Sequence, residues 1–157
     1  WMMELNLKEV LDERVITTAL DVKDKEEALR KMSGMLLANG YIADVDQFME
    51  DIYLREAEGI TGIGNGVAIP HGKSKSVTRI GIAIAKLKEA IAWESLDNQK
   101  VDLIFLFCVS SDKDFAKNHM RLLSKVAARI ADDDLLNQIK DSGQPQEIVS
   151  LMCGESA

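Results

Sequence analysis

The sequence predicts a single-domain α/β sandwich in which a mixed, mostly parallel sheet carries helices on both faces. The run from Leu103 to Val109 is apolar without interruption, which is typical of a strand buried on both faces. Segments with helical spacing of apolar residues precede and follow this run, so helices and strands alternate along the chain. With 157 residues the chain has the size of one domain, residues 1–157. Trp1 precedes Met2, and we expect residues 1–3 to be a cloning remnant or disordered.

The first part of the chain predicts a strand and then a helix. Residues 14–19 favour a strand because β-branched residues dominate them. Asp24 with Glu27 three residues later is typical of a capping box and predicts the start of a helix. Apolar residues keep helical spacing up to Gly40, which predicts the end of that helix.

A second helix is predicted to begin at Asp44 and to end before Gly59. This places Arg55 in its last turn, a short distance before a glycine-rich segment. A cation is favourable at the C-terminus of any helix because of the helix dipole, so a surface role for Arg55 is the alternative to a functional one.

The most distinctive segment runs from Thr61 to Lys73, with the sequence Thr-Gly-Ile-Gly-Asn-Gly-Val-Ala-Ile-Pro-His-Gly-Lys. Glycines let the backbone approach a ligand closely or adopt positive φ. Residues 67–69 predict a short buried strand, which Pro70 ends because proline has a fixed φ and no N–H. His71 is thus expected on a rigid support beside Gly72, which suits a histidine that meets an incoming group.

The second half predicts further strands and helices. Strands are predicted over residues 80–87 and 101–109, a long helix over 114–130, and short helices over 134–140 and 146–152. His119 lies near the start of the long helix, and both histidines of the chain follow predicted strand ends. Functional groups gather outside the carboxyl ends of strands in open α/β sheets, so we expect His71 and His119 to meet at one rim. Taken alone, the position of His119 favours a hydrogen-bonded histidine at the edge of the core over a functional one.

Composition and charge exclude several classes of protein. The net charge of −7, from 19 basic and 26 acidic residues, argues against nucleic acid and anionic membranes as partners. The sequence has no signal peptide and no apolar run near the ~20 residues of a membrane span, which predicts a cytoplasmic protein without membrane insertion. Cys108 and Cys153 are expected to be unpaired thiols. The sequence contains no P-loop, no Mg²⁺ carboxylate set and too few histidines for zinc, so we expect no cofactor and no metal.

The segment from Arg55-Glu56 through Thr61 to Lys73 closely resembles the active-site signature of one family. This family is the mannitol/fructose-type enzyme IIA of the bacterial phosphoenolpyruvate-dependent sugar phosphotransferase system. The resemblance extends from about residue 18 to about residue 151, and includes a second histidine in a segment like His119-Met120-Arg121-Leu122-Leu123.

The resemblance implies a phosphohistidine carrier. His71 would be the phosphorylated nucleophile, His119 would assist it, and Arg55 would stabilise the phosphoryl oxygens with its planar cationic fork. Thr61, Gly62 and Gly72 are expected to cradle the phosphoryl group. The implied donor is the histidine phosphocarrier protein and the implied acceptor is the cysteine of an enzyme IIB, in the uptake and phosphorylation of a fructose-like or mannitol-like sugar.

Alternatives remain at this point. A nitrogen-type relative of the family signals instead of transporting sugar, although residues 92–97 favour the sugar type. A non-enzymatic interaction module on the same fold is a second alternative. Lys73 and Lys75 are interpreted as solvated loop charges and Trp93 as a packing residue. Apolar residues near His71 are either core or the border of a small docking surface: Ile63, Val67, Ile69 and Pro70.

Overall fold

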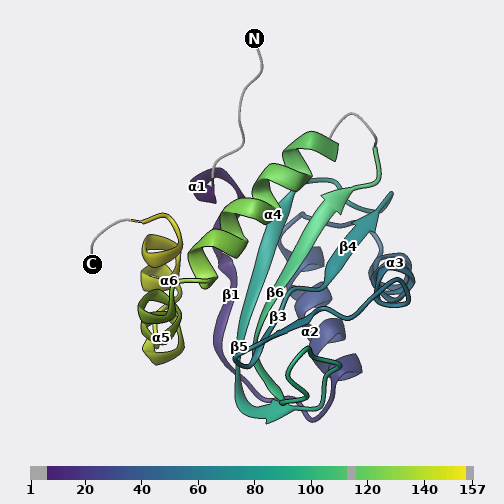
Figure 1. Ribbon diagram of the computed structural model, residues 1–157. Coiled ribbons are helices and arrows are strands. Elements are labelled where there is room, and N and C mark those ends of the chain that lie inside the picture. Colours follow the sequence, from purple (N-terminus) through teal and green to yellow (C-terminus); the bar gives the residue numbers. More distant parts are fainter. Residues whose placement is uncertain (1–6, 113–115, 155–157) are drawn as a thin grey trace.

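The computed structural model describes residues 7–112 and 116–154 and has one mixed sheet with helices on both faces (Figure 1). The strands are β1 (Leu11–Leu20), β2 (Gly62–Gly64), β3 (Val67–Ala68), β4 (His71–Ser74), β5 (Gly81–Ile91) and β6 (Val101–Ser110). The helices are α1 (Leu7–Val10), α2 (Lys25–Ala38), α3 (Val45–Glu56), α4 (Ala116–Ile130), α5 (Asp133–Asp141) and α6 (Pro145–Met152). Residues 1–3 and the expected first residue of the long helix, Asp114, lie outside the described residues.

The sheet confirms the predicted fold class. Its strand order is β1-β5-β6-β3-β2, and β4 also pairs with β6. β1 runs parallel to β5, while β3 and β4 both run parallel to β6. The pairs β5–β6 and β2–β3 are antiparallel, which makes the sheet mixed.

Strand β6 separates two hydrophobic cores, as its uninterrupted apolar run predicts. Its side chains alternate between the two faces with the period of two that strand geometry imposes. Ile104, Leu106 and Cys108 pack with α2 and α3 in one core. Leu103, Phe105, Phe107 and Val109 pack with α4, α5 and α6 in the other core.

Helices α2 and α3, which cover one face of the sheet, begin where their capping residues predict. The Asp24 side chain accepts a hydrogen bond of 2.8 Å from the N–H of Glu27, and Asp44 accepts one of 3.1 Å from Gln47. Helix α2 ends at Ala38, before Gly40 at φ 79°. Helix α3 ends at Glu56, and Arg55 does lie in its last turn.

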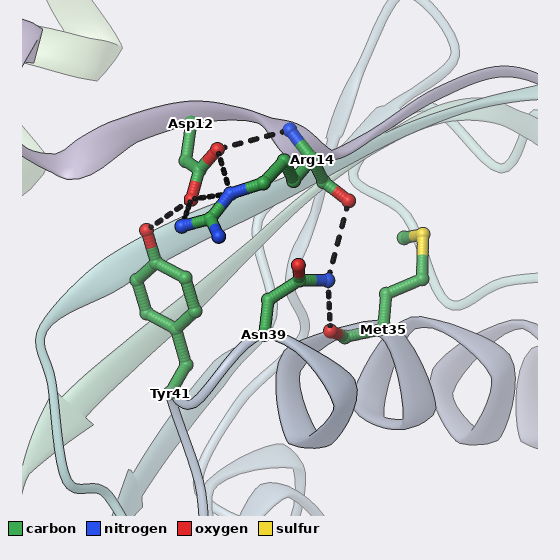
Figure 2. A network of polar contacts seen from close by, with 5 residues as sticks. All are labelled: Asp12, Arg14, Met35, Asn39 and Tyr41. Carbon is green, nitrogen blue, oxygen red and sulfur yellow. Dashed lines mark hydrogen bonds and ion pairs between the residues drawn. The ribbon is translucent and has the colours of Figure 1, made fainter.

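A polar network anchors the edge strand β1 to the loop that follows α2 (Figure 2). Asp12 accepts a hydrogen bond of 2.9 Å from the Tyr41 hydroxyl and is also bound by the guanidinium of Arg14. The hydrogen bond from Arg14 lowers the pKa of Asp12 to about 2. Burial, together with the bond to Asp12, raises the pKa of Tyr41 to about 12. Across the physiological pH range, Asp12 is therefore a charged carboxylate that is bound by the neutral phenol of Tyr41 and the cation of Arg14.

Candidate functional site

His71 is supplied by a short hairpin and the strand that follows it. The turn between β2 and β3 contains Asn65 at φ 57° and Gly66 at φ 77°, conformations that asparagine and glycine tolerate best. Pro70 separates β3 from β4, and its carbonyl accepts a hydrogen bond of 2.9 Å from the N–H of Phe107. His71 is the first residue of β4 and pairs with Phe107 on β6. The support of His71 is thus a sheet strand, where the sequence indicated only the end of one.

The two histidines meet, as predicted. The imidazole of His71 lies 5.6 Å from that of His119, centroid to centroid, at an interplanar angle of 62°. His71 lies on strand β4 and His119 lies on helix α4. This helix covers the face of the sheet to which the His71 side chain belongs (Figure 1). The other neighbour of His71 is Phe107, stacked at 5.0 Å and 23°. His71 is 5% exposed, and its Nδ1 is buried without a hydrogen-bond partner.

Burial keeps the His71 side chain neutral. Desolvation first, and then the nearby His119 and the positive charge of Arg55, lower the pKa of His71 to about 4, although the Ile69 carbonyl opposes them. Burial and the charge of Lys73 also lower the pKa of His119. Neutral imidazole carries the free electron pair that a nucleophile needs, so both rings hold their reactive form near pH 7.

Arg55 reaches the site from the last turn of α3. Its side chain is 36% exposed, its Nη1 donates a hydrogen bond of 3.4 Å to the Gly59 carbonyl, and its Nε lies 3.9 Å from Glu58 Oε2. The positive charge of Arg55 is one of the causes that lower the pKa of His71. These surface contacts are weak, so they do not fix the position of the guanidinium.

The residues expected to cradle a phosphoryl group surround the same strand but have partners within the protein. The Thr61 hydroxyl donates to Glu56 Oε1 at 3.0 Å and accepts from Trp93 Nε1 at 3.1 Å. The Gly62 N–H donates to the Glu94 carbonyl at 3.1 Å. Gly72 pairs with Cys108 and lies against Phe48. A phosphoryl group would have to compete with these partners for Thr61 and Gly62, and the cradle stays a prediction.

The apolar residues that flank His71 divide between core and surface. Val67 and Pro70 are buried, Ile69 is half-buried, and Ile63 is 37% exposed. Only Ile63 among them is open enough to contact a partner in full. Exposed apolar side chains of the described residues that the sequence did not single out include Ile60 at 48% and Met120 at 60%.

Sequence reasoning missed two contributors to the site. Phe107 stacks on His71, but in the sequence it was one of seven consecutive apolar residues and nothing distinguished it. Lys73 is exposed, as interpreted from the sequence, but its charge also lowers the pKa of His119. This effect depends on β4, a strand that the sequence did not indicate, so no signal in the sequence marked it.

The described part of the chain contains no cluster of side chains suited to a metal ion. Residues 7–112 and 116–154 contain no group of three or more His, Cys, Asp or Glu residues that could hold a metal ion. No helix within these ranges is long and apolar enough to cross a bilayer.

Comparison with known proteins gives this site its context. The family model described as "Phosphoenolpyruvate-dependent sugar phosphotransferase system, EIIA 2" matches residues 9–153. The chain belongs to this family. It is an enzyme IIA of the mannitol/fructose type, a component of a phosphotransferase system that transfers phosphoryl groups.

Curated relatives of this enzyme IIA differ in length. The 2-O-alpha-mannosyl-D-glycerate-specific EIIABC component of Escherichia coli is 36% identical over 129 residues, which are 82% of this chain and 20% of the relative. The chain therefore spans about a fifth of that relative. The nitrogen regulatory protein of Klebsiella oxytoca is 33% identical over 149 residues, 94% of this chain and 90% of the relative.

Solved structures confirm the enzyme IIA fold. The nitrogen regulatory protein IIA-Ntr of Neisseria meningitidis superposes with a TM-score of 0.82 at 26% identity, covering 92% of this chain and 97% of that one. The IIA mannitol structure of Escherichia coli has a TM-score of 0.75 at 19% identity, with 90% and 98% covered, and supports the fold alone.

Proposed function

We propose that this enzyme IIA is a phosphohistidine carrier in which His71 accepts a phosphoryl group from the histidine phosphocarrier protein and passes it to the cysteine of an enzyme IIB. The pathway would serve the uptake and phosphorylation of a fructose-like or mannitol-like sugar in the cytoplasm. The observation that carries the proposal is the pair of imidazoles of His71 and His119, whose centroids lie 5.6 Å apart. The positive charge of Arg55 also acts on this pair, because it lowers the pKa of His71.

The first transfer forms one phosphorus–nitrogen bond and breaks another. An electron pair of neutral His71 attacks the phosphorus of the donor's phosphohistidine, and the electrons of the broken bond return to the donor's imidazole. Because Nδ1 of His71 is buried, Nε2 is the nitrogen that we assign to this attack. In the second transfer a thiolate of enzyme IIB attacks the same phosphorus, and His71 regains its electron pair as neutral imidazole.

Arg55 and His119 are assigned to the charge of the phosphoryl group. A guanidinium presents a planar fork of N–H donors that matches phosphoryl oxygens, and its weak contacts with Gly59 and Glu58 leave it free to turn. His119 approaches His71 edge-on and its Nε2 is buried without a partner, so its ring is placed to donate a hydrogen bond to the bound group. Such preorganised donors stabilise charge that develops in the transition state.

The assignment of partners rests on relatives. One has a name that joins EIIA, EIIB and EIIC components in one chain. One solved relative is a complex of IIA mannitol with phosphorylated IIB mannitol. These names favour an enzyme IIB as the acceptor.

A second candidate function is the regulatory one. Nitrogen regulatory proteins match over 90% of their own length at 33–34% identity. The same phosphorylation of His71 would then control binding to a target protein instead of feeding a sugar.

Reconstitution tests the proposal and separates the two candidates. The chain is incubated with phosphoenolpyruvate, enzyme I and the histidine phosphocarrier protein, and acid-labile label is measured before and after addition of enzyme IIB and sugar-transporting membranes. Transport predicts rapid labelling followed by loss of label to sugar. Rapid labelling without onward transfer to any tested fructose or mannitol system would favour regulation, and absence of labelling would refute both.

A further inference from the structure

Glu56 follows Arg55 in the signature and is the last residue of α3. Its side chain is 8% exposed, although glutamate is rarely buried unless it is paired. Oε1 of Glu56 lies 2.5 Å from Nζ of Lys25 and accepts a hydrogen bond of 3.0 Å from the Thr61 hydroxyl. Oε2 is buried without a partner.

Trp93 completes the group that we call the Glu56 cluster: Lys25, Glu56, Thr61 and Trp93. The indole Nε1 donates to the Thr61 hydroxyl at 3.1 Å, and Lys25 Nζ lies 4.8 Å from the centre of the indole ring. The cluster therefore joins the first residue of α2, the last residue of α3, the start of the glycine-rich segment and the segment after β5. Trp93 was expected only to pack, and here it is also a donor.

The cluster is connected both to Arg55 and to the strand that leads to His71. On one side Glu56 is the direct neighbour of Arg55 in the last turn of α3. On the other side the Thr61 carbonyl accepts a hydrogen bond of 2.9 Å from the N–H of Ile69, two residues before His71. A shift of Glu56 would thus move Arg55 and the strand that leads to His71 relative to each other.

Burying a carboxylate to hold two segments together carries an unfavourable free energy of desolvation. Desolvating the charges of Glu56 and Lys25 costs more than a well-packed apolar pair of the same size, so stability alone does not account for the cluster. What an ion pair adds is a fixed geometry, because the charged groups tolerate only a few arrangements when they are buried.

We propose that Glu56 is a positioning residue that holds the last turn of α3 against Thr61 and so fixes the place of Arg55 relative to His71. The proposal rests on the proposed function, in which Arg55 acts on a phosphoryl group at His71. In this proposal Glu56 does not contact the phosphoryl group. It affects the reaction only by positioning Arg55.

The test compares Glu56→Gln, Arg55→Gln and the double variant by NMR titration of His71. Arg55 lowers the pKa of His71, so its removal raises that pKa. We expect Glu56→Gln to raise it in the same direction because Arg55 is no longer held, and the double variant to show no further rise. Loss of the negative charge of Glu56 by itself would act in the opposite direction, which makes the sign of the shift decisive.

Glu50→Gln is the matched control, because it removes the same charge from an exposed position of the same helix. It is expected to leave the pKa of His71 unchanged. Should Glu56→Gln not fold, Trp93→Phe decides, since it removes the donor to Thr61 and keeps an aromatic ring of smaller size at this position. It is expected to raise the pKa of His71 by a smaller amount. A folded Glu56→Gln or Trp93→Phe protein with unchanged pKa, or an equal shift in Glu50→Gln, overturns the proposal.

Transfer kinetics give an independent readout. Displacing a catalytic group by about 1 Å can cost on the order of 10²-fold in rate, so Glu56→Gln is expected to lower kcat for phosphoryl acceptance by about 10- to 100-fold with little change in KM. A rise in KM alone would overturn the positioning role. If the unsubstituted chain accepts no label, the proposed function fails while the titration still decides the role of Glu56.

Discussion

At the scale of single residues, His71 combines two features that work against each other in most proteins. It is 5% exposed, and yet the proposed function requires it to react with a group carried by another protein. Burial makes it neutral and nucleophilic by lowering its pKa to about 4. The stacked ring of Phe107 and the edge of His119 hold the imidazole plane. Nδ1 is buried without a partner, so Nε2 is the nitrogen that the proposed function assigns to the chemistry.

Phe107 is expected to set both the burial and the orientation of His71. Phe107→Leu removes the stacked ring and admits water, so it should raise the pKa of His71 toward its unperturbed value of ~6.5. NMR titration measures this. Phe105→Leu is the matched control, because Phe105 lies two residues away in the same strand and core and is equally buried. Equal His71 titrations in both variants would contradict the role given to Phe107.

The lowered pKa of His71 also predicts a dependence of stability on pH. Between about pH 6.5 and pH 4 the unfolded chain binds a proton at this residue and the folded chain does not, so stability falls as the pH falls through this window. The loss from His71 is about 3 kcal/mol by pH 4. Denaturant unfolding of His71→Gln should show a flatter pH profile in this window than the unsubstituted chain. A profile of the same slope would mean that His71 titrates normally in the folded protein.

At the scale of elements, strand β4 is what the sequence did not reveal. The caps at Asp24 and Asp44 and the buried run of β6 follow local rules and were predicted within a few residues. The four residues of β4 carry Lys, Gly and Ser, which show no strand preference. They form a strand because β6 offers a parallel neighbour, and that is a tertiary effect.

Gly72 is expected to be required by the contact between β4 and α3. A Cβ at this position would lie 2.1 Å from Cζ of Phe48, which is fully buried and has no room to move. Gly72→Ala should therefore destabilise the protein by about 1–3 kcal/mol through overpacking. Gly34→Ala is the control: Gly34 lies within α2 with nothing within 4 Å of its Cβ, so the change should stabilise by about 0.5–1 kcal/mol. Thermal unfolding compares them, and equal melting temperatures for the two variants would contradict this packing.

At the scale of the whole molecule, the sheet places residues that are far apart in sequence around one point. Helix α3 brings Arg55, β4 brings His71 and α4 brings His119 from the opposite side of the sheet to α2 and α3 (Figure 1). The long strands and helices and the meeting of the histidines could be predicted, since they follow from apolar patterns, strand ends and the family signature. The Phe107 stack and the Glu56 cluster could not, because they depend on side-chain contacts between elements whose relative orientation no local pattern fixes.

The central claim is that His71 carries the phosphoryl group and His119 assists without carrying it. The most direct measurement is rapid-quench labelling of His71→Ala and His119→Ala by the phosphorylated histidine phosphocarrier protein, with mass spectrometry to locate the phosphate. His71→Ala is expected to take up no label, whereas His119→Ala should be labelled on His71 with transfer slower by a factor on the order of 10²–10³. Phosphate on the His71→Ala protein, or unchanged transfer rates in His119→Ala, would contradict the account.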